Sequence, residues 1–247
     1  MEENRSRAEG RDLVLETRGI TKRFGGLVAL EGVDFQVRRG DLRAIIGPNG
    51  AGKTTFFNVV TGLLPPDGGD VFFRGERVTD LPPHAIARLG VARTLQVTSI
   101  FPGLSVEENL WVGANAAGDG RSIRERVGRV ADLLELGGLR KTPASDLSHG
   151  DQRLLEIGLA LSTEPELLLM DEPTAGLSAA ETRKLIPLIG RLGETLTVVI
   201  IEHDIKFLMK VARTLSVFHQ GRKIAEGDPD SIRANEEVQE VYLRGTA

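Results

Sequence analysis

The 247-residue sequence contains no cysteine. Disulfide bonds, thiolate metal sites and thiol redox chemistry are therefore excluded, and the absence agrees with a reducing cytosolic compartment. Long hydrophobic runs are also missing, because uninterrupted aliphatic runs such as 167–170 and 198–201 cover only four residues, whereas a bilayer-spanning helix needs about 20. Residues 1–12 mix acids, arginines and small side chains, so we expect no secretory signal there.

The sequence also lacks an excess of basic residues. Lysine and arginine together number 31 against 35 acids, a net charge of −4. A protein that binds mainly to a phosphate backbone normally has a basic excess, so we expect no nucleic-acid partner. With 40% hydrophobic and 27% charged residues, no internal repeat and no flexible linker, the chain is typical of one continuous globular unit.

Hydrophobic patterning predicts strands that alternate with helices. Apolar runs bounded by turn residues predict the strands, and apolar residues at spacings of three and four predict the helices. Strand–helix–strand repeats favour a parallel sheet in an α/β fold. The expected strands are 13–17, 33–37, 42–46, 71–73, 91–95, 167–170, 197–201, 214–218 and 223–226; helical segments are expected at 53–61, 106–136, 179–192 with an interruption or kink at Pro187, and around 231 and 238–242.

A glycine-rich loop follows the expected strand at 42–46 and opens the expected helix at 53. Backbone N–H groups of such a loop, with the helix N-terminus, can surround phosphate oxygens, and glycines permit the close approach. Lys53 would neutralise the phosphates, and Thr54 would bind Mg²⁺. An accidental glycine-rich turn is the alternative. The predicted nucleotide site comprises Gly47, Pro48, Asn49, Gly50, Ala51, Gly52, Lys53, Thr54 and Thr55.

Two acids end the apolar segment at 167–170. Asp171 and Glu172 would lie at the carboxyl edge of a parallel sheet, where ligands of open α/β sheets bind. Asp171 suits a Mg²⁺ contact through water, and Glu172 could orient or deprotonate an attacking water. The alternative is an ordinary solvated strand end. The phosphate loop in the same chain favours the catalytic interpretation.

Residues 147–151, Leu-Ser-His-Gly-Asp, resemble the Leu-Ser-Gly-Gly-Gln signature of ATP-binding cassette (ABC) ATPases. With the motifs above in the same order, the resemblance covers roughly 13–243. His149 and Asp151 depart from the family pattern, whereas Ser148 and Gly150 match the positions that bind the γ-phosphate of ATP on the opposite subunit. A simpler alternative is that Ser148 only caps a helix, whose start we place near Gln152.

The resemblance assigns roles to three further residues. Gln96 matches the hinge glutamine that can touch Mg²⁺ or the water, and His203 matches the switch histidine that reads the γ-phosphate. Phe24 stands where the family has an aromatic residue that stacks on adenine. The alternatives are that Gln96 is an ordinary polar residue at a strand end, that His203 is an ordinary histidine at a strand terminus, and that Phe24 is a core phenylalanine. Ser178 replaces the aspartate that is usual in the segment crossing the dimer.

The fold implied by the resemblance is α/β: a phosphate-loop, RecA-like core over 1–96 and 161–247, a small antiparallel β part, and a helical signature subdomain over 97–160. The implied activity is hydrolysis of ATP with Mg²⁺ by two ATPase subunits, identical or paralogous, arranged head to tail. The implied partners are separate transmembrane permease subunits, docked near 97–109, and indirectly a periplasmic or extracellular substrate-binding protein. The implied location is the inner face of the cell membrane, in the cytoplasm.

Finer similarity points to ATPases of branched-chain amino-acid importers. The segments that carry it are 24–27, 93–96, 155–157, 201–204 and 241–243. Urea or short-chain amide importer ATPases are the alternative, since they share several of these segments and the histidine at His149. A soluble ABC ATPase of DNA repair would need a long coiled coil, which the sequence lacks. A nucleotide-binding module that does not hydrolyse is disfavoured by Glu172 and His203.

Overall fold

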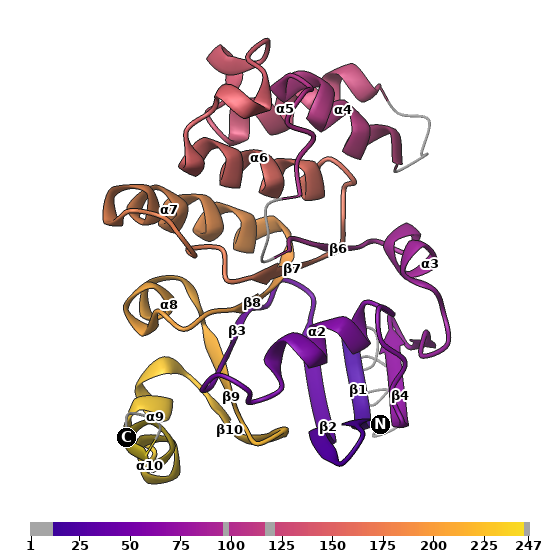
Figure 1. Ribbon diagram of the computed structural model, residues 1–247, viewed down its shortest axis with the longest axis vertical. Helices are drawn as coiled ribbons and strands as arrows, with labels where there is room; N and C mark the ends of the chain where they lie inside the picture. Colours follow the sequence, from indigo (N-terminus) through magenta and orange to yellow (C-terminus); the bar gives the residue numbers. More distant parts are fainter. Residues whose placement is uncertain (1–11, 96–98, 117–121, 245–247) are drawn as a thin grey trace, which may run out of the picture.

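The computed structural model describes residues 12–95, 99–116 and 122–244. Within these residues the strands form two sheets (Figure 1). A four-stranded antiparallel sheet has the order β2 (Leu27–Arg38), β1 (Leu13–Phe24), β4 (Gly68–Phe73) and β5 (Glu76–Arg77). A six-stranded sheet, parallel except for its β10–β9 pair, has the order β10 (Arg222–Gly227), β9 (Thr214–His219), β3 (Leu42–Ile46), β8 (Thr197–Ile201), β7 (Leu167–Asp171) and β6 (Val91–Arg93).

Every residue of the three central strands β3, β7 and β8 is buried, which explains why their sequences are mostly apolar. Successive side chains enter opposite faces of the sheet. In β7, for example, Leu167 and Leu169 join one hydrophobic cluster, and Leu168 and Met170 join the other. The sheet therefore separates two cores, and the ends of its strands lie between them.

Helix α2 (Lys53–Val60) packs in the core shared by the two sheets (Figure 1). The Phe56 ring meets Phe35 of β2 and Phe218 of β9 edge to face, with ring centroids 5.1 and 5.4 Å apart. Such pairs add about 0.5–1.5 kcal/mol beyond the burial of their area. The helix that follows the phosphate loop is thus held from both sides.

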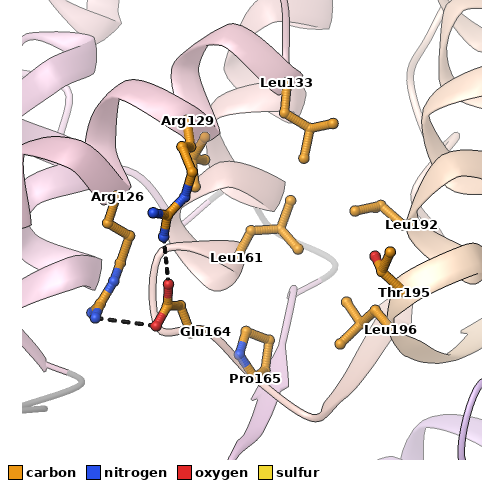
Figure 2. A pocket seen from close by; sticks show the side chains of 10 residues that line it. Arg126, Arg129, Leu133, Leu161, Glu164, Pro165, Leu192, Thr195 and Leu196 are labelled. Atoms are coloured by element: carbon orange, nitrogen blue, oxygen red, sulfur yellow. Dashed lines mark hydrogen bonds and ion pairs between the residues drawn. The ribbon is translucent and has the colours of Figure 1, made fainter. Parts of the chain in front are cut away.

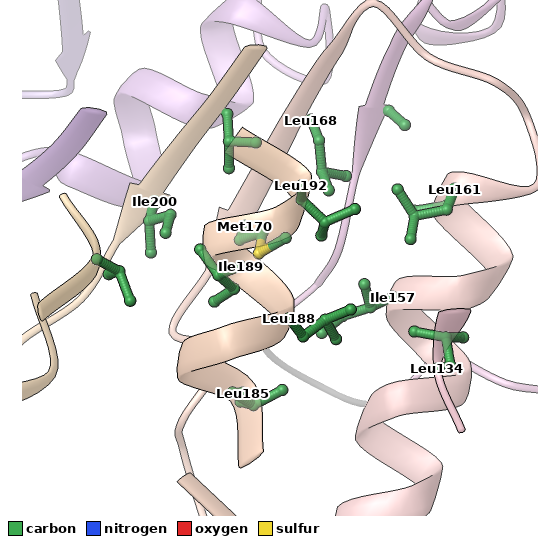
Figure 3. Packing of buried hydrophobic residues seen from close by; sticks show 14 of the residues in the cluster. Leu134, Ile157, Leu161, Leu168, Met170, Leu185, Leu188, Ile189, Leu192 and Ile200 are labelled. Carbon is green, nitrogen blue, oxygen red and sulfur yellow. The ribbon is translucent and has the colours of Figure 1, made fainter. Parts of the chain in front are cut away.

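The opposite face of the six-stranded sheet is covered by α7 (Ala179–Thr195) and α8 (Ile205–Val211). Figure 3 shows Leu185, Leu188 and Leu192 of α7 packed in this cluster with Met170. The expected interruption of α7 is wrong, because the helix runs through Pro187. Pro187 lies on the exposed side, so water can hydrogen-bond to the backbone carbonyl that a proline leaves without an N–H partner.

A helical layer lies beyond α7 (Figure 1). It contains α4 (Val106–Ala116), α5 (Ile123–Leu133) and α6 (His149–Leu161), and 3₁₀ turns at Gly137–Leu139 and Ala144–Asp146 lead from α5 to α6. The expected helical segment 106–136 is therefore two helices. All three helices begin within the predicted helical subdomain, and α6 ends one residue past its limit; the division of the chain at 97 and 160 stays a prediction.

A pocket of about 440 Å³ lies where α5, the end of α6 and α7 meet (Figure 2). Arg126 and Arg129 of α5 both pair with Glu164, at 3.2 and 2.6 Å, while Leu133, Leu161, Leu192 and other apolar side chains line the rest. The ion pairs tie α5 to the loop that leads from α6 into β7. Arg126 is only 1% exposed and also donates to the Ala114 carbonyl at 2.9 Å.

The remaining elements are short: α3 (Pro83–Arg88), α9 (Pro229–Ala234) and α10 (Glu236–Arg244). Strands β1 and β2 extend beyond the expected 13–17 and 33–37 because β1 continues past Gly19 through a register shift between Thr17 and Ile20. A bulge of this kind interrupts the alternation of side chains that sequence patterns detect. None of the described helices is long and apolar enough to cross a membrane. The α/β class with an antiparallel part is confirmed.

Candidate active site

The phosphate loop, residues 47–52, connects β3 to α2 in a backbone shape that requires glycine. Gly47 has φ +152°, and a Cβ there would lie 2.1 Å from the Phe218 carbonyl oxygen. Gly52 has φ +101°, and its Cβ would lie 2.5 Å from the Ala29 carbonyl oxygen. Because real Cβ atoms do not approach that closely, both glycines are needed where the loop passes against β9 and β2.

Lys53 is buried inside this loop. Its ammonium group donates to the carbonyl oxygens of Gly47 at 2.7 Å and Pro48 at 3.0 Å. Burial lowers the pKa of Lys53, while the charges of Glu172 and Asp171 act in the opposite direction. A cation held among carbonyls and two carboxylates is placed to neutralise phosphate groups that enter the loop.

The other predicted loop residues are open to solvent to different degrees. Asn49, Gly50 and Thr54 are exposed, whereas Pro48, Gly52 and Thr55 are half-buried and Ala51 is buried. Ala51 accepts a hydrogen bond from the Gly221 N–H at 3.1 Å, which ties the loop to the turn between β9 and β10. The loop therefore presents its outer residues to solvent while its base is held by neighbouring strands.

Asp171 ends β7 and is 1% exposed. Its Oδ2 pairs with Arg93 of β6 at 2.8 Å, and its Oδ1 is buried without a hydrogen-bond partner among the described residues. Burial raises the pKa of Asp171, and the hydrogen bond from Arg93 opposes that rise. An unpartnered buried carboxylate oxygen beside a phosphate loop fits a Mg²⁺ ion held through water.

Glu172 occupies a strained backbone position directly after β7. Its φ is +48°, in the left-handed region, which costs a residue with a side chain on the order of 1–3 kcal/mol. The Glu172 N–H donates to the Ile201 carbonyl at 2.8 Å, which joins it to the end of β8. A strained residue at the carboxyl edge of the sheet, beside Asp171 and near Lys53, is typical of a functional position.

His203 follows β8 and stands beside Glu172. Its Nδ1 lies 4.0 Å from Glu172 Oε1 and 3.5 Å from Glu202 Oε2, and its side chain is 65% exposed. The structure thus brings together the proposed base and the proposed switch histidine. The predicted contact of His203 with the γ-phosphate stays a prediction.

Glu202, which the sequence analysis passed over, is fully buried and organises this edge. It accepts hydrogen bonds from the backbone N–H groups of Thr174, at 2.9 Å, and His203, at 2.8 Å, and from the Thr174 hydroxyl. The segment after Glu172 and the start of the histidine loop are therefore joined through one carboxylate. Its position at the end of an apolar run was the available signal.

Other charged residues without an assigned role are Arg153 and Glu156, which are buried, and Arg93, whose side chain is only 8% exposed. Arg93 donates to Asn58 of α2 at 2.6 Å as well as pairing with Asp171, so it links β6, α2 and β7. Arg153 and Glu156 pair within α6. Their spacing of three on a helix was a signal for a side-chain pair, although nothing in the sequence alone indicated its burial.

Phe24 lies at the end of β1 and is 46% exposed, which excludes the core-phenylalanine alternative. The Lys22 ammonium lies 5.7 Å from the centre of its ring. An exposed aromatic face is available for stacking on a base, and that role stays a prediction. Gln96 lies outside the described residues.

The signature residues begin α6, and here the expected start is wrong: the helix begins at His149 instead of near Gln152. Ser148 is its N-cap, since Ser148 Oγ accepts from the Asp151 N–H at 3.1 Å and donates to Asp151 Oδ2 at 2.8 Å. The aspartate that replaces the family's glutamine thus bonds the Ser148 hydroxyl through both its backbone N–H and its carboxylate. The capping alternative is correct as a description of Ser148, and the predicted phosphate contact stays a prediction.

Gly150 donates its N–H to Glu181 Oε1 of α7 at 3.1 Å, and a Cβ at Gly150 would lie 2.6 Å from the same oxygen. Glu181 also closes a capping box with Ser178, the residue that replaces the family's aspartate. In this conformation the signature donors are therefore bonded to carboxylates of the same chain. Binding of a phosphate would have to displace these contacts.

Comparison with known proteins places these features in one family. The ABC transporter family model matches residues 30–175, and a model of the branched-chain amino acid ATP-binding cassette transporter matches 222–243. The high-affinity branched-chain amino acid transport ATP-binding protein BraF of Pseudomonas aeruginosa is 40% identical, with 93% of this chain and 97% of BraF covered. LivG of Escherichia coli, with the same description, is 39% identical at the same coverage.

Solved structures give the same assignment. A nucleotide-free ATP-binding cassette from an ABC transporter is 32% identical, with a TM-score of 0.84 and 93% and 98% of the two chains covered. An ADP-bound cassette of an ABC transporter has the same identity and a TM-score of 0.85, covering 94% of this chain and 98% of that chain. The chain therefore belongs to the ABC transporter family, as one of its ATP-hydrolysing cassettes.

Proposed function

We propose that this chain is the ATP-hydrolysing subunit of an importer for branched-chain amino acids. The observation that carries the proposal is the 39–40% identity to BraF and LivG over 93% of the chain, and the match at 222–243 supports the same branch. The site has groups that can support hydrolysis, because an acid, a histidine and a phosphate loop lie at one edge of the sheet. Urea is the alternative cargo and serves as the comparison substrate.

The proposed binding of ATP uses the phosphate loop and β1. Phe24 stacks on the adenine, the loop backbone at 47–52 binds the phosphates, and Lys53 neutralises them. Thr54, Asp171 and Gln96 would hold the Mg²⁺ that accompanies ATP, and this ion supplies charge neutralisation at the phosphates. The unpartnered Oδ1 of Asp171 supports this assignment.

In the proposed hydrolysis, Glu172 accepts a proton from the attacking water and His203 contacts the γ-phosphate. Their side chains lie 4.0 Å apart, so one water and one phosphate oxygen can be reached by both. Electrostatic stabilisation and positioning supply most of the catalysis in phosphoryl transfer. Lys53 serves that purpose: burial lowers its pKa, and the charges of Glu172 and Asp171 oppose that lowering.

The proposed assembly is a head-to-tail pair of cassettes, so that Ser148 and Gly150 of one chain close on the ATP of the other. Permease subunits carry the cargo through the membrane, a binding protein delivers it on the outer side, and this chain sits on the cytoplasmic face. Phe101, in the segment before α4, and Trp111 of α4 are 47% and 50% exposed, which supports a docking surface there.

Transport in proteoliposomes tests the proposal. The chain is co-purified from detergent extracts with its membrane partners, which are identified and reconstituted with the binding protein and internal ATP. We expect uptake of leucine, isoleucine and valine that stops with Glu172→Gln, and no uptake of urea. Urea uptake without leucine uptake would contradict the proposed cargo and leave the ATPase assignment standing.

A further inference from the structure

We propose that Arg153, a buried arginine on the signature helix α6, is the positioning residue that holds Glu172 in its working orientation, with Glu156 as its partner. The inference rests on the proposed function of Glu172 as the base. It adds a connection inside one chain, from the helix that starts at the signature to the acid at the end of β7. Arg153 touches neither nucleotide nor water in this account and acts only through Glu172.

Arg153 binds three consecutive carbonyl groups at the end of β7. Its Nη2 donates to the carbonyl oxygens of Asp171 at 2.9 Å and Glu172 at 2.8 Å, and its Nε donates to Pro173 at 3.2 Å. The residue is 3% exposed, so water cannot replace these bonds without opening the core. The path of the chain through Glu172 is therefore tied directly to α6.

The backbone strain at Glu172 explains why such a tie is needed. A residue with a side chain stays at φ +48° only when its surroundings over-determine that conformation. The Glu172 N–H is bonded to Ile201 on β8, and the Glu172 carbonyl is bonded to Arg153 on α6. Because both backbone groups of Glu172 are bonded, the position of α6 determines the direction of the Glu172 carboxylate.

Glu156 completes the arrangement. Its carboxylate pairs with Arg153 Nη1 and accepts hydrogen bonds from the backbone N–H groups of Leu95, at 3.0 Å, and Ser99. Arg153 Nη1 also donates to the Leu95 carbonyl at 2.9 Å. Burial raises the pKa of Glu156, and the charge of Arg153 opposes that rise. The pair is thus bonded to Leu95 as well as to Glu172.

The chemistry of the side chain makes arginine specific here. A guanidinium has five N–H donors in a planar fork, and the five acceptors are four backbone carbonyls and the Glu156 carboxylate. Lysine keeps the charge but has three donors on one atom, so it cannot reproduce the arrangement. Arg153→Lys therefore removes the geometry and preserves the charge.

The test compares Arg153→Lys with the matched control Arg126→Lys, which changes an equally buried arginine of the helical layer that is bonded to Ala114 and Glu164. Single-turnover hydrolysis and ADP affinity are measured for each. We expect Arg153→Lys to slow hydrolysis by about 10- to 100-fold, as a small misplacement of a reacting group does, with ADP affinity unchanged within about twofold. For Arg126→Lys we expect both the hydrolysis rate and the ADP affinity to stay within about twofold of the wild type.

The decisive arm repeats both changes in a Glu172→Gln chain. If Arg153 acts through Glu172, Arg153→Lys causes no further slowing once the base is gone, because the two changes remove one function. A further fall of tenfold or more in that background would overturn the proposal, and so would equal slowing by the two lysine variants. Should Arg153→Lys fail to fold, Glu156→Gln replaces it with the same expected non-additivity.

Amide hydrogen exchange on the nucleotide-free chain provides a readout that does not depend on ATP hydrolysis. Arg153→Lys should speed exchange in peptides that cover 171–175, and Arg126→Lys should not; unchanged exchange there in Arg153→Lys would overturn the positioning role. A wild-type chain that hydrolyses no ATP would instead contradict the proposed function. The two failures are therefore distinguishable.

Discussion

The two surfaces proposed to enclose ATP differ in how their polar groups are held. In the phosphate loop, the Lys53 ammonium donates to two carbonyl oxygens of the loop itself, those of Gly47 and Pro48. At the signature, Ser148 is bonded to Asp151 and Gly150 to Glu181. One surface is therefore prepared for an anion, whereas the other is occupied by carboxylates of its own chain.

This difference indicates that dimerisation is the step at which hydrolysis can be regulated. We expect the preformed loop to bind nucleotide in the single chain, since its shape is set by close contacts of Gly47 and Gly52 with neighbouring strands. In the proposed dimer the signature would exchange these internal hydrogen bonds for phosphate contacts, which would lower the net gain on dimerisation. We expect each prediction below to affect one surface and spare the other.

The largest expected effect comes from Glu172→Gln at the loop surface. The substitution removes the base while keeping the shape of the side chain, so hydrolysis should fall by about 10² to 10⁴ while ATP binding persists. Single-turnover assays with separate binding measurements check both. Glu194→Gln, on the exposed side of α7, is the control and should hydrolyse ATP normally.

Lys53→Ala should abolish tight binding of ATP, because phosphate groups in the loop lose their main countercharge. Calorimetry checks this, with Lys210→Ala on the exposed face of α8 as the control. The measurement is made at low protein concentration, where dimerisation is disfavoured, so the signature residues do not affect it. Unchanged ATP affinity in Lys53→Ala would mean that the loop does not bind phosphate.

Phe24→Ala should weaken ATP by about 1–3 kcal/mol, the usual value of a base–aromatic stack. Inorganic triphosphate, which has no base, should bind the variant and the wild type equally. Competition titrations with both ligands measure the two affinities. An equal loss for ATP and triphosphate would show that Phe24 acts in some way other than stacking.

The smallest expected effect is at the signature surface. Asp151→Gln restores the residue usual in the family and removes a carboxylate bonded to Ser148. Because one hydrogen bond contributes about 0.5–1.5 kcal/mol net, ATP-dependent dimerisation should strengthen by about tenfold or less. Analytical ultracentrifugation in a Glu172→Gln background checks it, and weaker dimerisation would mean that Asp151 assists the contact.

Much of the fold was predictable because its strongest patterns are local. The buried strands at 42–46, 167–170 and 197–201 lie within a residue of their predicted bounds, since full burial on both faces leaves mostly apolar sequences. Long-range effects were not predictable. The bulge after Thr17 and the solvated proline in α7 depend on contacts that sequence patterns do not contain.

The site shows the same division. Residues of the phosphate loop, Asp171 and Glu172 were identified because contiguous motifs carry them. Glu202 and Arg153 were not, because their importance comes from burial against segments distant in the chain. Likewise, the bond between Gly150 and Glu181 joins residues 31 positions apart, so only the folded chain reveals that the signature donors are occupied.

Size-exclusion chromatography with light scattering tests whether ATP is shared between two chains. The Glu172→Gln chain should form a dimer in ATP and not in ADP, because ATP that binds the dimer better than the monomer shifts the equilibrium. Adding Ser148→Arg should abolish this dimer while each monomer still binds its nucleotide. A dimer that forms equally with and without the Ser148 change would contradict the account and reduce 147–151 to a helix start.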